Sequence, residues 1–119
     1  MWKFLRRAIV FVGVAGVALA GPPQTGSASW YGESHRGKLM ADGQPFDPDK
    51  LTAASWFYPL GTKVRVTASG STNTVEVTIT DRGPARKQVE QGRIIDLARA
   101  AFERLAARDQ GLINVTVQD

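Results

Sequence analysis

Two aspartates, Asp81 and Asp96, stand where a carboxylate could act as an acid or a base. Asp81 follows the alternating run V-E-V-T-I-T (75–80), which predicts a half-buried strand, and it precedes the turn signal Arg82-Gly83-Pro84. Asp96 follows Ile94-Ile95, and the apolar residues after it recur at helical spacing. A carboxylic acid whose pKa is raised by burial or by a like charge can give a proton to a leaving group and take one back.

Each aspartate also has a structural interpretation. Asp81 could pair with Arg82 or accept backbone N–H bonds within the turn. Asp96 could be the N-cap of a helix predicted over 97–107, where its carboxylate would satisfy free helix N–H groups. The apolar stripe of that helix comprises Leu97, Ala98, Ala101, Phe102 and Leu105.

The first twenty residues are typical of a secretory signal peptide. Lys3, Arg6 and Arg7 precede an apolar run over 8–18, and Ala18-Leu19-Ala20 fits a cleavage site after Ala20. Retention of this segment as an N-terminal anchor is the alternative. Under both interpretations the rest of the chain is exported, to the periplasm or the extracellular space. The sequence has no cysteine, so we expect neither a lipid anchor nor a disulfide.

Composition limits the possible partners of the exported part. Three of the 15 basic residues and none of the 11 acidic residues lie in 1–20, so residues 21–119 carry a formal charge of only +1. Nucleic-acid binding therefore has little compositional support. With one histidine, no cysteine and no clustered carboxylate spacing, we expect no metal site and no cofactor.

The remaining hundred or so residues predict one mainly β domain. We expect a flexible lead over 21–25 and a monomeric domain over 26–119. Short strands are predicted at 26–31, 63–67, 75–80 and 112–117, with a short apolar segment at 51–54 and a long loop over 33–49. Short strands with one helix before the last of them favour a small closed barrel, because closure removes exposed strand edges.

Seven short motifs, in order, resemble the rare lipoprotein A (RlpA) family. They are A-S-W-Y-G (28–32), H-R-G-K (35–38), A-D-G-Q-P-F-D (41–47), L-T-A-A (51–54), P-L-G-T-K-V-R-V-T (59–67), T-D-R-G-P (80–84) and G-R-I-I-D-L-A-R-A-A (92–101). The resemblance implies a six-stranded double-psi β-barrel, the fold also of expansins. It further implies a lytic transglycosylase that cleaves peptidoglycan glycan strands lacking stem peptides and leaves 1,6-anhydro-muramyl ends.

The resemblance also implies roles for individual residues. Asp81 matches the aspartate of the family's D-R-G-P motif, which is assigned to catalysis, so Asp81 is the first candidate for the acid and base. Asp96, the second candidate, matches the essential acid of expansin-like barrels. Gln44 and Ser55 stand where the family has a glutamate and a histidine. Neither side chain transfers protons readily at neutral pH, so a non-catalytic or expansin-like glycan-binding module is the alternative function. His35 matches a different family histidine and is interpreted as an exposed or turn residue.

Aromatic side chains near the predicted loops suggest a binding groove for sugar rings. Core packing is the alternative for at least half of them. The expected substrate-binding residues are Tyr31, Gln44, Ser55, Trp56, Tyr58 and Arg82. The expected partners are peptidoglycan glycan strands, together with cell-division or cell-wall proteins.

Overall fold

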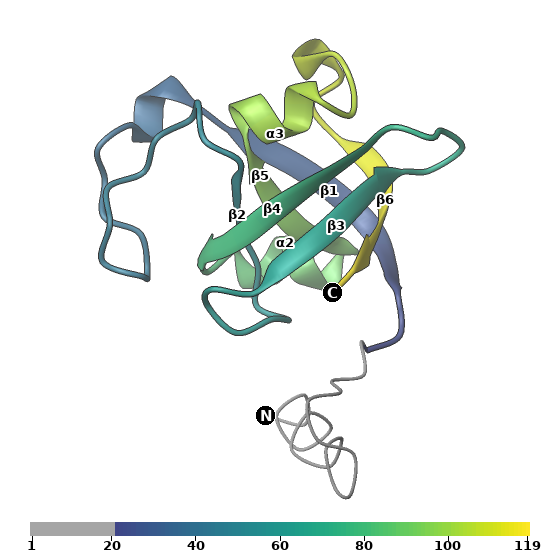
Figure 1. The fold of residues 1–119 in the computed structure, drawn as a ribbon, viewed down its shortest axis with the longest axis horizontal. Coiled ribbons are helices and arrows are strands. Elements are labelled where there is room, and N and C mark those ends of the chain that lie inside the picture. Colours follow the sequence, from purple (N-terminus) through teal and green to yellow (C-terminus); the bar gives the residue numbers. More distant parts are fainter. Residues whose placement is uncertain (1–20) are drawn as a thin grey trace, which may run out of the picture.

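The computed structural model describes residues 21–119, so the predicted signal peptide and its cleavage site after Ala20 lie outside the described residues. Figure 1 shows the strands wound into a barrel with short helical segments between them. The elements in chain order are β1 (Gln24–Tyr31), η1 (Glu33–His35), β2 (Thr52–Ala54), β3 (Lys63–Ala68), β4 (Thr74–Asp81), α2 (Arg86–Glu90), β5 (Arg93–Ala98), α3 (Arg99–Glu103), η2 (Arg108–Gln110) and β6 (Ile113–Gln118). Strand β1 begins two residues earlier than predicted, inside the expected flexible lead.

The strands close in the order β1-β5-β2-β4-β3-β6, which confirms the predicted six-stranded barrel. Two pairs, β1 with β5 and β2 with β4, are parallel, and the other four pairs are antiparallel. The parallel pairs join segments that are distant in the sequence. Within residues 21–119, no helix is long and apolar enough to cross a membrane.

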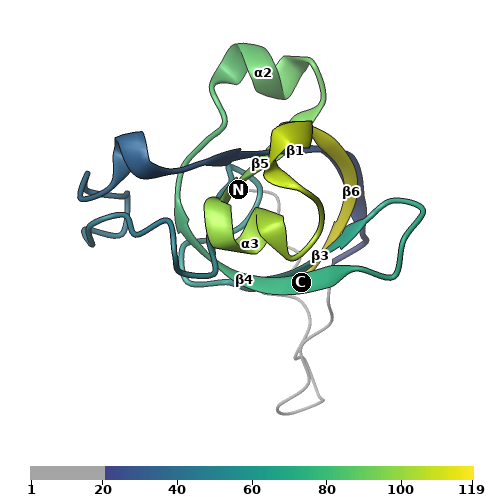
Figure 2. The same ribbon diagram turned by 90° about the horizontal axis from the view of Figure 1, so that it is seen from above.

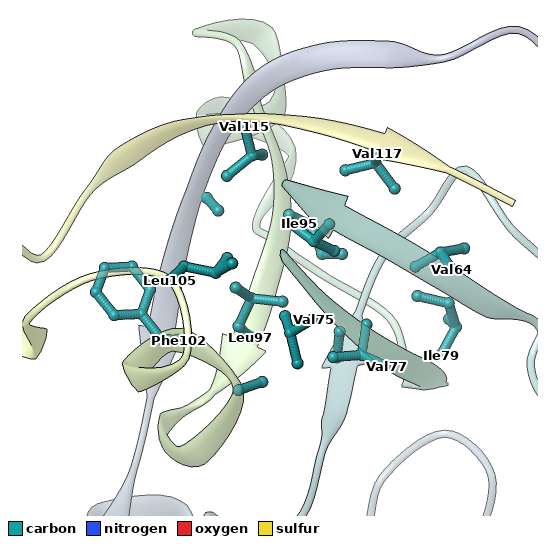
Figure 3. Packing of buried hydrophobic residues seen from close by; sticks show 14 of the residues in the cluster. Val64, Val75, Val77, Ile79, Ile95, Leu97, Phe102, Leu105, Val115 and Val117 are labelled. Atoms are coloured by element: carbon teal, nitrogen blue, oxygen red, sulfur yellow. The ribbon is translucent and has the colours of Figure 1, made fainter. Parts of the chain in front are cut away.

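The barrel interior is filled by aliphatic side chains from alternate strand positions, as expected for strands with one buried face. Figure 3 shows them pointing toward one another, with Phe102 and Leu105 closing one end. The largest fully buried members are Phe102, Ile79, Ile95, Leu97, Val64, Val66, Val77, Val115 and Val117. Figure 2, seen from above, places α3 over the opening of the barrel.

The predicted helix over 97–107 is wrong at both ends, because residues 97–98 and 104–107 are not helical. Leu97 and Ala98 belong to β5, and α3 covers only Arg99–Glu103. Leu97 pairs with Trp30 of β1 and with Ala53 of β2, and this pairing on both edges overrides the helical spacing of the apolar residues. Asp96 is therefore inside a strand, and its interpretation as a helix N-cap is wrong. The segment between Pro84 and β5 contains the short helix α2.

The long loop from η1 to β2 (33–50) folds against the outside of the barrel. Met40 and Phe46 of this loop pack on Ala98 and on the ring of Tyr31, forming a second apolar cluster. Figures 1 and 2 show this loop on the side of the barrel away from the turn that joins β3 and β4. The loop thereby covers part of the outer face on which the candidate acidic residues lie.

Candidate active site

Asp81 and Asp96 lie in one row across three neighbouring strands. Ala54 of β2 pairs with Asp81 of β4 on one side and with Asp96 of β5 on the other. Two strand spacings separate the aspartate backbones by about 10 Å. The neighbouring row of Ala53, Ile79 and Leu97 points into the core, so the aspartates belong to the outer face. A shift of register between Ala53 and Ala54 brings Asp81, rather than Thr80, into this row.

Asp96 is half-buried and has two close neighbours. The hydroxyl of Ser29, its partner in β1, donates a hydrogen bond to Asp96 Oδ1. A Cβ added to Gly83 would lie 3.5 Å from Asp96 Oδ2, an ordinary van der Waals distance, so the Gly83 backbone runs beside this carboxylate. Burial raises the pKa of Asp96, and the Ser29 bond and the charge of Arg93 offset only part of this rise.

Asp81 ends β4 and is held by backbone donors. Its Oδ1 accepts the N–H of Ala41, from the 33–50 loop, at 2.9 Å and the N–H of Arg82 at 2.8 Å. Its Oδ2 has no hydrogen-bond partner among residues 21–119. One carboxylate oxygen thus fixes the side chain, and the other remains available to a ligand.

Tyr31 joins the same region from β1. It pairs with Ala98, two residues beyond the Ser29–Asp96 pair and therefore on the same face. Its ring stacks on Phe46 with centroids 4.2 Å apart, and its buried hydroxyl has no protein partner in the described part of the chain. Burial is the main cause that raises the pKa of the phenol, and the charges of Asp81 and Asp96 add to it. The phenol is therefore a neutral donor beside two carboxylates.

Arg82 does not close off Asp81. Its Nη1 donates to the carbonyl oxygens of Ser55 at 2.7 Å and Tyr58 at 2.6 Å, which fastens the segment after β2 to the end of β4. Ser55 is 0% exposed, and its hydroxyl accepts the N–H of Phe57 and donates to the carbonyl of Ile94.

Ser55 and Tyr58 are thus not placed for the substrate binding expected of them. Tyr58 belongs to the barrel core, and its buried ring has almost no exposed surface to offer a sugar. Tyr58 therefore packs in the core, which was the alternative interpretation of the aromatic residues. Arg82 remains half-buried, with one guanidinium nitrogen committed to the two carbonyls.

Trp56 and Gln44 lie at the surface. Trp56 is 55% exposed, and its indole N–H donates to the carbonyl of Pro84 at 2.6 Å. Gln44 lines a separate pocket of about 200 Å³ with residues that include Asp42, Asp47 and Thr80 but neither Asp81 nor Asp96. Trp56 is therefore tied to the turn that follows Asp81, whereas Gln44 is not joined to either carboxylate by a hydrogen bond.

The sequence pointed to neither Ser29 nor His35 as a member of this site. Ser29 is revealed only by the β1–β5 register, because it lies 67 residues from Asp96 in the chain. His35 meets Tyr31 edge-on at 5.6 Å, and its charge acts on Asp96. In residues 21–119, no group of three or more histidine, cysteine or acidic side chains could hold a metal ion.

A closed six-stranded barrel of mixed strand pairing, with an acidic row on its outer face, defines the chain as a double-psi-type β-barrel. Residues 23–117 match the DPBB_1 family, described as lytic transglycolase, and the chain belongs to this family. A relative from Yersinia pestis, the endolytic peptidoglycan transglycosylase RlpA, is 46% identical over 82 residues, which are 69% of this chain and 22% of that protein. The chain thus spans less than a quarter of that relative's length.

Two solved structures share the fold. The Streptomyces papain inhibitor is 28% identical, with a TM-score of 0.63 over 83% of this chain and 94% of the inhibitor. The expansin of Clavibacter michiganensis is 22% identical, with a TM-score of 0.60 over 81% of this chain and 49% of the expansin. The predicted family and the predicted barrel are both confirmed.

Proposed function

We propose that this protein cleaves peptidoglycan glycan strands as a lytic transglycosylase, with Asp96 as the acid and base and Asp81 as its partner. The observation that carries the proposal is the row Asp81–Ala54–Asp96, in which burial raises the pKa of Asp96. A raised pKa keeps more of the acid protonated near neutral pH, as general acid catalysis requires. The assignment exchanges the roles that the sequence suggested, since Asp81 was the first candidate for the acid.

The mechanism needs no water. Asp96 gives its proton to the glycosidic oxygen while the bond from that oxygen to C1 of a muramyl residue breaks, and the leaving sugar keeps the proton. The Asp81 carboxylate stabilises the positive charge that develops at C1. The 6-hydroxyl oxygen of the same muramyl residue then bonds to C1 and releases its proton to Asp96, which restores the acid. The product ends in a 1,6-anhydro-muramyl residue.

A glycan-binding module without cleavage is the second candidate. It is favoured by Gln44, which stands where the resembling family has a glutamate, and by Ser55, which replaces a histidine and is buried. These residues leave the site without the helpers expected beside Asp81. For both candidate functions we propose that the 1–20 segment directs export. Cell-division or cell-wall proteins are the proposed partners in both.

Mass spectrometry of the products separates these two functions. We expect the full chain, incubated with glycan strands stripped of stem peptides, to release fragments with 1,6-anhydro-muramyl ends. Asp96→Asn should lower the rate by about 10²–10⁴-fold, and Asp81→Asn by about 10²-fold. Asp109→Asn, an exposed site on η2, is the matched control and should keep full activity.

Two results would change the assignment. A wild-type protein that pellets with cell-wall sacculi but releases no anhydro products would support the binding module. An Asp96→Asn variant with full activity would remove Asp96 from the reaction.

A further inference from the structure

Trp56 is an exposed aromatic side chain held in a fixed orientation. It directly follows the buried Ser55, and its indole N–H donates to the carbonyl of Pro84 at 2.6 Å. An indole of which more than half is exposed, with its polar atom already satisfied, offers its apolar face to a ligand. Because it is already ordered, a ligand stacked on it need not fix its rotamer.

A pocket of about 280 Å³ lies beside this ring. Trp56 and Phe57 form one wall, and Arg86 and Val89 of α2 form the other. The lining is apolar except for the guanidinium. Its volume is below the range of about 300–1,000 Å³ of pockets that enclose a small molecule, which fits one residue of a longer chain lying across the surface.

Arg86 is available for a ligand. It is exposed and takes part in no ion pair within the described range 21–119. The segment between the two site aspartates carries four basic residues, at 82, 86, 87 and 93, and one acidic residue, Glu90. This side of the molecule therefore complements a negatively charged ligand.

Two residues link the wall of the pocket to the acidic row. A Cβ added to Gly83 would lie 3.5 Å from Asp96 Oδ2, so this glycine lies beside the carboxylate, and the carbonyl of the next residue, Pro84, accepts the indole N–H of Trp56. A ligand that spans Asp96 and the Trp56 ring would pass over this Gly83-Pro84 step. The indole and the acidic row can therefore contact successive residues of one extended chain.

We propose that Trp56 and Arg86 form a subsite for a sugar that bears a free carboxylate, such as the lactyl group of an unsubstituted muramyl residue. The sugar ring stacks on the indole, and the Arg86 guanidinium pairs with the carboxylate in the planar, two-point geometry that arginine favours. This inference rests on the proposed action on glycan strands and extends it, because it makes the missing stem peptide a requirement for binding. A peptide on the lactyl group would remove the charge that Arg86 recognises.

The test measures binding, so it does not depend on cleavage. Isothermal titration of the full chain would use three short glycans of equal length: one with free lactyl carboxylates, the same glycan with those groups amidated, and a neutral chitin oligomer. We expect the free carboxylate form to bind about fivefold more tightly than the other two. Because Asp96→Asn lies outside the subsite, it allows the titration to be repeated without cleavage.

Four variants assign the binding preference to individual residues. Arg86→Gln should abolish the preference for the carboxylate and leave binding of the neutral oligomer unchanged. Lys87→Gln removes the same charge from the next residue, which does not line the pocket, and should keep the preference. Trp56→Ala should weaken all three glycans about tenfold or more, whereas Trp56→Phe, which keeps a ring, should lose less.

Several outcomes would overturn the subsite. Equal losses in Arg86→Gln and Lys87→Gln would mean that general charge, and not the pocket, attracts the glycan. Unchanged binding in Trp56→Ala would place the sugar elsewhere. A concentration-dependent dimer that Trp56→Ala abolishes would make the pocket a contact between two copies.

Absence of anhydro products together with a carboxylate preference would refute the cleavage step and keep the subsite.

Discussion

At the scale of single residues, Asp96 shows how the barrel creates a carboxyl group suited to proton transfer. Its strand position places it between Ser29 and Ala54, where it is partly removed from water. Removal from water disfavours the charged form, and one hydroxyl donor restores only part of the lost solvation. When the Asp96 carboxylate is ionised it is poorly solvated in the folded state, and this lowers the free energy of unfolding.

That cost predicts that Asp96→Asn stabilises the protein. The folded pKa of Asp96 lies above its ordinary value of 3.8, so the folded state holds this proton more tightly than the unfolded state does. Wild-type stability thus falls as the pH rises from 3.8 through the folded pKa. Asparagine is neutral, and its side-chain oxygen can still accept a hydrogen bond from the Ser29 hydroxyl. We expect a gain of about 1 kcal/mol in the free energy of unfolding at pH 7, which disappears as the pH is lowered to 3.8.

Urea denaturation at a series of pH values measures this gain. Asp109→Asn, on the exposed surface of η2, should change stability by less than about 0.5 kcal/mol at every pH. If Asp96→Asn were less stable than the wild type at pH 7, the Ser29 bond to the charged carboxylate would outweigh its burial. Asp96 would then be a poor proton donor.

At the scale of elements, the 33–50 loop is fastened by a network of ion pairs. Glu33 and Asp49, near its two ends, each contact both Arg36 and Arg99. Arg99 begins α3, and its side chain is only 17% exposed, so it links the loop to the barrel. These arginines hold the pKa of Glu33 at about 2, so the network loses this charge only when the pH falls toward that value.

Loss of Arg99 should loosen this loop without unfolding the barrel. We expect trypsin to cut Arg99→Met several times faster than the wild type after Arg36 and Lys38, which lie exposed in the loop. Because the pairs are largely at the surface, the melting temperature should fall by only a few degrees. Arg104→Met, at an exposed arginine without an ion pair among residues 21–119, is the control and should be cut at the wild-type rate at these two sites. Equal rates in the two variants would show that the apolar cluster under the loop holds it without the ion pairs.

The elements also show what the sequence could predict. The strands over 63–67 and 75–80 were evident because their apolar residues alternate and their hairpin turn is marked by Gly70. Strand β5 was missed because I-I-D-L-A fits both periods over so short a run, and only its pairing with β1 and β2 decides between them.

The sequence predicted the two aspartates of the candidate site but not the residues that contact them. Asp81 was indicated by the strand before it and the turn after it. The contact of Ser29 with Asp96, and the burial of Ser55, depend on strand pairings between distant segments. No local pattern reports such pairings, so the surroundings of Asp96 and Ser55 are visible only in the fold.

At the scale of the whole molecule, closure of the barrel assembles the site. Strand β1 pairs with β5 on one edge and β6 on the other, so it joins the acidic row to the last strand of the chain. Gly26 lies where β1 runs close beside the start of β5. A Cβ there would lie 2.7 Å from the carbonyl oxygen of Gly92 and 2.8 Å from a methyl group of Ile94. The first contact is with backbone, which cannot rotate away.

Gly26→Ala should therefore weaken the barrel and its acidic row together. We expect a loss of about 2–3 kcal/mol in the free energy of unfolding, because the added methyl must push β1 and β5 apart. Gly70→Ala is the matched control. Gly70 has a φ of 75° in the β3–β4 turn, with open space around it, so alanine there should cost only about 1 kcal/mol.

Urea denaturation compares the free energies of unfolding of the two variants. A glycan cleavage assay then distinguishes a displaced acidic row from a loss of stability. Under conditions where both variants are fully folded, Gly26→Ala should also lose activity, because displacement of β1 moves Ser29 away from Asp96. Gly70→Ala, on the hairpin away from the acidic row, should keep it. If Gly26→Ala cost no more stability than Gly70→Ala, the β1–β5 contact would be able to relax without loss. The geometry of the acidic row would then depend on the β2 pairings alone.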